Sequence, residues 1–159
     1  MFLYHGSNVA VENPQLLKIY RALDFGRGFY TTTDMEQAQK WAKRTALRLQ
    51  QNQSFVTVYE IDEQKMNALR FLQFDMPNLE WLRFVVQNRT GQSLKDEWDI
   101  VKGPVADDQT VVVIDLYLDG MFSEEDAINR LLPQRLKNQY AFKTDTAIDL
   151  LQCVEVLPL

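Results

Sequence analysis

The segment Tyr4-His5-Gly6-Ser7 contains the only histidine of the chain. An imidazole can hydrogen-bond a ligand or exchange a proton near neutral pH, and Ser7 adds a short hydroxyl beside it. Gly6 has no side chain, so a flat ligand could approach the backbone closely there. These residue types predict a polar binding or catalytic site. The alternative is a histidine at a strand end whose ring hydrogen-bonds a neighbouring loop.

A second segment, Asp24-Phe25-Gly26-Arg27-Gly28-Phe29-Tyr30, carries two of the six glycines of the chain beside three aromatic rings. This spacing is typical of a tight turn that leads into a strand, and the rings offer flat faces for stacking. The segment is not a phosphate-binding loop or a dinucleotide fingerprint, because the later glycine and the preceding strand of those motifs are missing. A third segment, Asn138-Gln139-Tyr140-Ala141-Phe142-Lys143, by itself predicts only a half-buried strand.

Together and in this order, the three segments resemble the ADP-ribosyltransferase superfamily, in its branch similar to diphtheria toxin and the poly(ADP-ribose) polymerases. That branch carries His-Gly-Ser on its first strand, Phe-Gly-x-Gly-x-Tyr on its second core strand, and Glu-Tyr near its C-terminal end. The matching residues here are His5-Gly6-Ser7, Phe25 to Tyr30 and, with one change, Gln139-Tyr140.

The chain also resembles a family of bacterial proteins with an Asp-Phe-Gly-x-Gly-Phe-Tyr signature. That family carries Gln-Ala-x-x-Trp-Ala, matched by residues 37–42, and Asp-Ile-Val-x-Gly-Pro-Val-Ala-Asp-Asp, matched by residues 99–108. The resemblance spans essentially the whole chain. It implies an α+β fold with a split β-sheet core and flanking helices, with NAD in the cleft. Residues 1–159 are expected to form a single domain of this type, because no repeat or linker interrupts them.

The resemblance also implies a role for each matching residue. His5 would bind the adenosine-side ribose of NAD, the Gly6 backbone would hold the nicotinamide carboxamide, and Tyr30 would stack on the nicotinamide ring. Trp41 would cover the other face of that ring or, alternatively, pack in the core of its helix. NAD would be the substrate, and no metal is expected.

Further NAD contacts are expected from the same segments and the loop before the second one: Ser7, Arg21, Phe25 and Gly28. Arg21 or Arg27 would meet the pyrophosphate, although an arginine near a loop can equally be a solvated surface charge. Ala38 stands where the superfamily has a serine that binds the carboxamide. One amide contact of the superfamily is therefore missing from this sequence.

Gln139 replaces the glutamate that, in the superfamily, holds the ribose hydroxyl beside the breaking bond. Cleavage of the N-glycosidic bond develops positive charge on the ribose, so negative potential there stabilises the transition state. A neutral amide can accept the hydrogen bond of the hydroxyl, but it brings no full charge and cannot act as a base. Loss of one such group costs about 10²–10³ in rate. The acceptor, or an acid such as Asp145 or Glu155, would then supply the missing charge.

The sequence therefore predicts an NAD-dependent mono-ADP-ribosyltransferase, a glycosyltransferase in which His5, Tyr30 and Gln139 replace a His-Tyr-Glu triad. Its macromolecular acceptor is unknown. The alternatives are a catalytically weak or inactive module that binds NAD or ADP-ribose, a transfer similar to that of RNA 2′-phosphotransferases, and a structural interaction domain. By analogy alone, the chain could be a toxin-type effector neutralised by a protein partner, as in toxin–antitoxin pairs.

Composition sets the class of protein within which these motifs act. The chain has 159 residues, of which 46% are hydrophobic and 25% charged, as in ordinary globular domains. Its net charge of −5 gives no strong nucleic-acid signal. The sequence shows no secretory leader and no apolar run near the roughly 20 residues of a membrane span, so a cytoplasmic protein without membrane contact is expected. Cys153 lies in an apolar stretch that predicts a buried, inert thiol.

The elements that must position the motifs follow from periodicity and from capping residues. Strands are predicted at residues 2–4, 54–61, 99–102, 140–143 and 153–157, and residues 8–23 predict a loop. Helices are predicted from Asp34 to about Gln51, from Asn78 to Arg89, from Ser123 to about Leu132 and from Thr144 to about Leu151. Residues 111–118 have both strand propensity and a helical face, and a helix is chosen. Without regular βαβ alternation, α+β is the predicted class.

Overall fold

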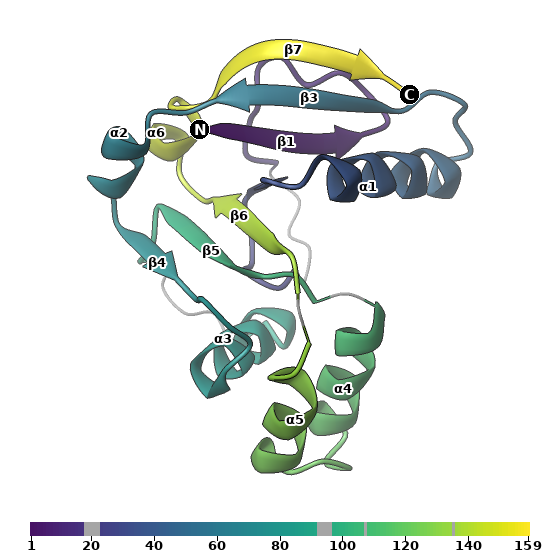
Figure 1. Ribbon diagram of the computed structural model, residues 1–159, viewed down its shortest axis with the longest axis vertical. Helices are drawn as coiled ribbons and strands as arrows, with labels where there is room; N and C mark the ends of the chain where they lie inside the picture. The colour runs from purple at the N-terminus through teal and green to yellow at the C-terminus, as the bar shows by residue number, and fades with distance from the viewer. Residues whose placement is uncertain (18–22, 92–96, 107, 135) are drawn as a thin grey trace.

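The computed structural model describes residues 1–17, 23–91, 97–106, 108–134 and 136–159. Its strands form one seven-stranded sheet in the order β4-β5-β6-β2-β1-β3-β7 (Figure 1). The strands are β1 (Phe2–Ser7), β2 (Phe29–Thr32), β3 (Phe55–Glu60), β4 (Phe71–Gln73), β5 (Ile100–Pro104), β6 (Asn138–Phe142) and β7 (Gln152–Pro158). The helices are α1 (Met35–Arg48), α2 (Glu63–Asn67), α3 (Leu79–Arg89), α4 (Asp108–Leu118), α5 (Glu124–Leu131) and α6 (Asp145–Ile148). The predicted α+β class is confirmed.

The sheet is weakly joined between β1 and β2. Six residue pairs connect β1 to β3, and four connect β2 to β6, whereas Tyr4 and Thr32 form the one pair between β1 and β2. All neighbouring strands are antiparallel except β4 and β5, which are parallel. In Figure 1 the strands β7, β3 and β1 form an upper group, and β6, β5 and β4 lie below it. The sheet is therefore continuous, with its weakest junction between β1 and β2.

Helix α1 packs directly against β1, as Figure 1 shows. Asp34 caps the helix by accepting a hydrogen bond from the backbone N–H of Gln37, and alanines form its buried face. A Cβ atom on Gly6 would lie 1.9 Å from the carbonyl oxygen of Ala38 and 2.8 Å from the backbone nitrogen of Ala42. Gly6 is therefore needed because α1 packs closely against β1. The sequence had predicted instead that a flat ligand approaches the backbone at Gly6.

Two hydrophobic clusters form the core, each around a different set of elements. One lies around the upper strands with α2 and α6, and its buried residues include Leu3, Tyr59, Ile61, Phe142 and Ile148. The other lies among α3, α4, α5 and the lower strands, and its buried residues include Phe25, Trp81, Leu82, Ile114 and Leu131. Trp81 is fully buried and its indole N–H donates to the carbonyl of Pro104 at 3.1 Å, which joins α3 to the end of β5.

Most predicted elements are confirmed. The strand at residues 2–4 extends to Ser7, and the helices predicted after Asp34 and Asn78 are α1 and α3. Residues 108–118 form helix α4, so the helix predicted for residues 111–118 is confirmed. Helix α5 begins with the capping box that Ser123 and Asp126 predict. No helix in the described part of the chain has both the length and the apolar character that crossing a bilayer requires.

Other predictions were wrong in detail. The strand predicted at residues 99–102 continues through Gly103 and Pro104. Proline has no N–H to donate, but β4 already ends opposite Lys102, so no strand on that side of β5 requires this N–H. The short elements α2 and β4 were not predicted, and α6 ends at Ile148 rather than near Leu151. Cys153 is only half-buried, because β7 is an edge strand and exposes several of its side chains.

Candidate functional site

A cavity of about 360 Å³ lies beside the junction of β1 and β2. His5 and Gly6 of β1, Tyr30 of β2, Trp41 and Thr45 of α1, and Gln139 of β6 line it. Leu23 and Asp24 before β2, Arg89 at the end of α3, and Val105 and Ala106 after β5 complete its wall. Its volume falls within the roughly 300–1,000 Å³ of small-molecule sites. The structure thus brings all three sequence motifs to one cavity.

The His5 ring is fixed by one hydrogen bond and one ring contact. Its Nδ1 lies 2.7 Å from the carbonyl oxygen of Tyr30, so Nδ1 carries the proton and donates, and the ring stacks on Phe29 at 4.4 Å between centroids. Desolvation by burial lowers the pKa of His5 below its ordinary value, against a smaller upward effect of the bond to Tyr30. The neutral ring therefore keeps a lone pair on Nε2, which no group in the described chain engages.

Tyr30 closes the turn that the glycine-rich segment forms. Its hydroxyl donates to the carbonyl of Gly26 at 2.7 Å and accepts from the backbone N–H of Phe25 at 3.1 Å. Gly26 has a φ of 75°, a conformation that favours glycine. The buried amine of Lys143 donates to the carbonyl of Phe25 and holds the same turn from β6. The Tyr30 ring is thus positioned at the cavity wall by contacts on the turn side.

Trp41 is half-buried and does not belong to the core of α1, whose buried face is formed by smaller residues. Its indole lines the cavity and also a neighbouring groove of about 260 Å³. Thr45 lines both spaces as well, and Arg44 and Arg48 complete the groove. Guanidinium groups bind phosphates and carboxylates through paired hydrogen bonds. The cavity is therefore continued along α1 by a groove that suits an anionic group.

Gln139 is 5% exposed and lies beside a carboxylate. Its side-chain amide nitrogen donates to Asp24 Oδ2 at 3.3 Å. The same oxygen accepts from the backbone N–H of Ala106 at 3.3 Å, while Oδ1 accepts from Arg89 Nε at 2.9 Å and from a second Arg89 nitrogen at 2.6 Å. Both side chains of the ion pair are largely shielded, with Asp24 13% and Arg89 18% exposed. An acid, an amide and a cation therefore meet at one end of the cavity.

Other predicted site residues do not line this cavity. Phe25 is fully buried and packs against Tyr30, Phe74 and Phe84, so it supports the site from behind. Gly28 packs against β6, and the Ser7 hydroxyl donates to the side chain of Asn8. The remaining expected contacts were the two arginines. Arg27 is exposed and donates to the carbonyl of Leu17, while Arg21 lies outside the described residues.

The prediction that Asp145 or Glu155 compensates for Gln139 was wrong. Asp145 begins α6 and lines a different cavity, and Glu155 lies exposed on β7. The acid beside Gln139 is Asp24, which sequence reasoning missed as a site residue. The available signal was its place directly before the Phe-Gly-x-Gly motif.

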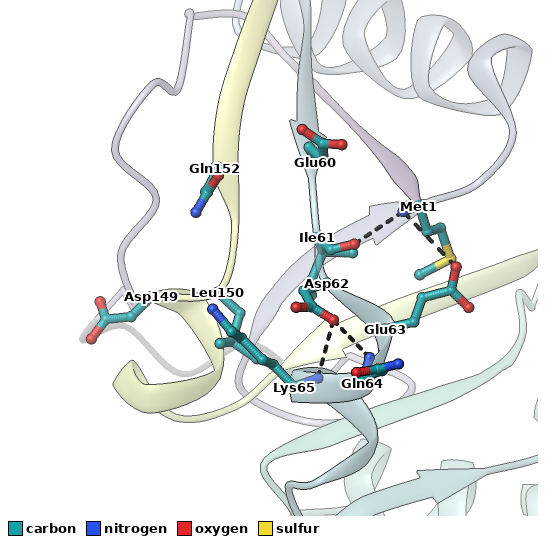
Figure 2. A pocket seen from close by; sticks show the side chains of 10 residues that line it. All are labelled: Met1, Glu60, Ile61, Asp62, Glu63, Gln64, Lys65, Asp149, Leu150 and Gln152. Carbon is teal, nitrogen blue, oxygen red and sulfur yellow. Dashed lines mark hydrogen bonds and ion pairs between the residues drawn. The ribbon is translucent and has the colours of Figure 1, made fainter.

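A second cavity, of about 660 Å³, lies between α2 and the start of β7 (Figure 2). Two of its acids serve the local structure: Asp62 accepts from the backbone N–H groups of Gln64 and Lys65, and Glu63 lies 3.9 Å from the ammonium of Met1. None of the three sequence motifs contributes to its wall. A substitution at this cavity should therefore leave the cavity with the three motifs unchanged.

The fold and the cavity together define a mixed α+β protein with a polar and aromatic pocket beside the weak junction of β1 and β2. The chain belongs to the family DUF3990, described as a protein of unknown function, whose model matches residues 1–153. No curated protein and no solved structure matches the chain. Within its described residues, no group of three or more His, Cys, Asp or Glu side chains is arranged to hold a metal ion.

Proposed function

We propose that this protein binds NAD in the cavity beside β1 and β2 and transfers its ADP-ribose group to an acceptor. One observation carries the proposal. His5, Gly6, Tyr30, Trp41 and Gln139 come from four separate elements, and all five line one cavity. These are the positions to which the resemblance to ADP-ribosyltransferases assigns the contacts with nicotinamide and ribose. The weak junction between β1 and β2 also agrees with the split sheet of that superfamily.

Binding in this proposal uses the aromatic and imidazole groups of the wall. The nicotinamide ring stacks with Tyr30 and Trp41, since flat π-systems favour offset stacking. The neutral His5 accepts a hydrogen bond from a ribose hydroxyl at Nε2, because its Nδ1 is already committed to Tyr30. The groove lined by Arg44 and Arg48 offers cationic groups for the diphosphate. This replaces the expected role of Arg27, whose side chain lies elsewhere.

Catalysis breaks the bond between the ribose C1′ and the nicotinamide nitrogen. The bonding electron pair leaves with that nitrogen, so cationic nicotinamide departs as the neutral molecule. A lone pair of the acceptor forms the new bond to C1′, and the proton of the acceptor passes to solvent. Positive charge develops on the ribose before the new bond is complete, so an oxygen that accepts a hydrogen bond from the ribose hydroxyl stabilises the transition state. The Gln139 side chain supplies that oxygen in this proposal.

A second candidate is a module that binds NAD or ADP-ribose without turnover. The observation that favours it is the state of the charges at Gln139. The amide itself is neutral, and the Asp24 carboxylate beside it is paired with Arg89, so the cluster of three side chains carries no net charge. Without negative potential at the ribose, cleavage would be so slow that bound NAD would dissociate intact.

The experiment incubates the purified protein with NAD that carries a labelled nicotinamide and measures free nicotinamide over hours. Thermal unfolding with and without NAD is measured in parallel, because ligand at about 100 times its Kd adds about 2.7 kcal/mol of stability. The variants are His5→Ala and Gln139→Glu. Lys65→Ala, an exposed substitution at the second cavity, is the control and should behave as the wild type.

Nicotinamide release by the wild type that His5→Ala abolishes supports the transferase. Thermal stabilisation by NAD without release, together with release by Gln139→Glu, supports the binding module. If NAD does not stabilise the wild type or any variant against thermal unfolding, and none of them releases nicotinamide, both candidates are refuted.

A further inference from the structure

The Asp24 carboxylate divides its two oxygens between two kinds of partner. Oδ1 receives both hydrogen bonds from Arg89, and Oδ2 receives the Gln139 amide and the backbone N–H of Ala106. The end of α3, strand β6 and the segment after β5 therefore all contact one carboxylate, which the loop before β2 provides. Gln139 lies 115 residues from Asp24 in the chain, so this contact exists only in the folded protein.

This contact decides which end of the Gln139 amide faces Asp24. A carboxylate has only acceptor oxygens, so the amide must present its N–H₂ group to Asp24. The carbonyl oxygen Oε1 then points away from the carboxylate, and no group in the described chain donates to it. Gln139 lines the cavity, which leaves its oxygen as an acceptor for a ligand there.

The carboxylate also changes the electronic character of that oxygen. The bond from the Gln139 amide to Asp24 is long, at 3.3 Å, but its acceptor is ionised, which makes it stronger than a bond of that length between neutral groups. It draws amide electron density toward the carbonyl oxygen, and such polarisation along a chain of hydrogen bonds is larger where water is excluded. The shielded position of Asp24 and Arg89 meets that condition. Arg89 cancels the net charge of the cluster but binds Oδ1, whereas the amide meets Oδ2, so part of the effect of the carboxylate can still be transmitted through the neutral amide.

We infer that Asp24 is the positioning residue of the site: it orients Gln139 so that Oε1 faces the ribose hydroxyl of NAD, and it polarises that oxygen. Arg89 holds the carboxylate in place from the opposite side. The inference rests on the proposed function for the identity of the ligand, but the Asp24–Gln139 contact itself is testable without NAD. In this arrangement the chain has glutamine where the superfamily has glutamate, and the Asp24 carboxylate is hydrogen-bonded to that glutamine.

The first experiment exchanges the acid and the amide and measures urea unfolding between pH 5 and 8. In Gln139→Glu two carboxylates share one cation, so one carboxyl has a raised pKa in the folded state and stability falls as pH rises. In Asp24→Asn/Gln139→Glu the amide and the acid have exchanged positions and only one carboxyl remains. The loss of stability at high pH should therefore disappear. The charged and titratable groups around the pair, unchanged in all variants, are Arg89 with Asp115 at 3.9 Å behind it, His5 and Tyr30.

A double variant more stable than the sum of the single changes, with no loss at high pH, supports the inference. Strict additivity of the two changes at every pH overturns it, because residues in contact must couple. This result does not depend on NAD, so it separates the contact from the proposed function.

The second experiment measures kcat and KM for nicotinamide release by the wild type, Asp24→Asn and the double variant. Loss of the charge behind the amide should lower kcat about tenfold in Asp24→Asn, with KM changed less than threefold, since the charge acts mainly in the transition state. The double variant should recover kcat to at least the wild-type value. Equal kcat in Asp24→Asn and wild type overturns the inference and leaves the transferase standing. If no protein turns over NAD while the unfolding data show coupling, the transferase fails and the positioning of Gln139 stands.

Discussion

His5 provides a pH-dependent readout of the site, because the chain has no other histidine. Burial lowers its pKa in the folded protein, whereas the unfolded chain titrates near the ordinary value of about 6.5. Below that pH the unfolded state binds more protons than the folded state, so stability falls as pH falls. His5→Gln removes this contribution. We expect the difference in unfolding free energy between wild type and His5→Gln to shrink as pH falls from 7.5 to 5.5.

Urea unfolding at steps of half a pH unit tests this, and the carboxylates cancel because both proteins contain them. Parallel stability curves for the two proteins across this range would contradict a desolvated, neutral His5. The same neutrality leaves the Nε2 lone pair available to a ligand hydroxyl at pH 7.

Residue types alone could identify some of the site but not its acid. His5 and Tyr30 belong to recognisable motifs, and both line the cavity. Phe25 belongs to the same motif, yet it is fully buried, because a motif does not say which of its rings faces inward. Asp24 lies directly before the motif, but its contact with Gln139 depends on the pairing of β2 with β6, which no spacing in the sequence encodes.

At the scale of the elements, Asp99 connects β4, β5 and α6. Its carboxylate accepts from the backbone and side chain of Arg70, at 3.1, 3.0 and 2.8 Å, and from the hydroxyl of Thr144 at 3.1 Å. Hydrogen bonding from Arg70 lowers the pKa of Asp99 to about 2. A carboxyl with a lowered folded pKa adds stability above its ordinary pKa and loses it as pH falls to the folded value.

Asp99→Asn should therefore lower the free energy of unfolding by about 1–2 kcal/mol at pH 7, chiefly through weakened hydrogen bonds. The ion pair itself adds little, because the Arg70 side chain is 58% exposed and screened by solvent. The difference from wild type should decline between about pH 4 and pH 2 in an acid series of unfolding measurements. A difference that stays constant down to pH 2 would show that Asp99 acts through packing instead.

The contrast between the helices and the short strand β4 shows which elements could be predicted. Helices α1, α3 and α5 carry their own signals, in capping residues and apolar periodicity, and these signals were sufficient. Strand β4 has three residues and lies parallel to β5, so it depends on a partner rather than on a pattern of its own. Its position is set by tertiary contacts such as Arg70 with Asp99, which a local reading of the sequence does not contain.

At the scale of the whole molecule, the net charge does not describe the surface beside the cavity. The chain carries a net charge of −5, yet Lys40, Lys43, Arg44 and Arg48 all lie exposed on α1. Two of these residues line the groove that continues the cavity. The acidic total weakly disfavours anionic partners in solution, whereas the local field along α1 favours an anionic group at this face.

The two parts of the sheet give the last prediction. β1 belongs to the group with β3 and β7, β2 and β6 to the group with β5 and β4, and one residue pair joins the groups. A ligand in the cavity contacts both groups and so restrains their relative opening. Saturating NAD should slow amide hydrogen exchange in peptides covering residues 2–7, 29–32 and 138–142 together, because local openings at the junction are suppressed.

Exchange at short times in α5 should stay unchanged, because α5 contributes nothing to the cavity wall. Mass spectrometry of the same peptides from His5→Ala should show no NAD effect. Protection confined to residues 29–32 and 138–142, with β1 unaffected, would mean that the ligand sits on one part of the sheet only. The assignment of His5 to the ribose would then be lost, even if NAD binds.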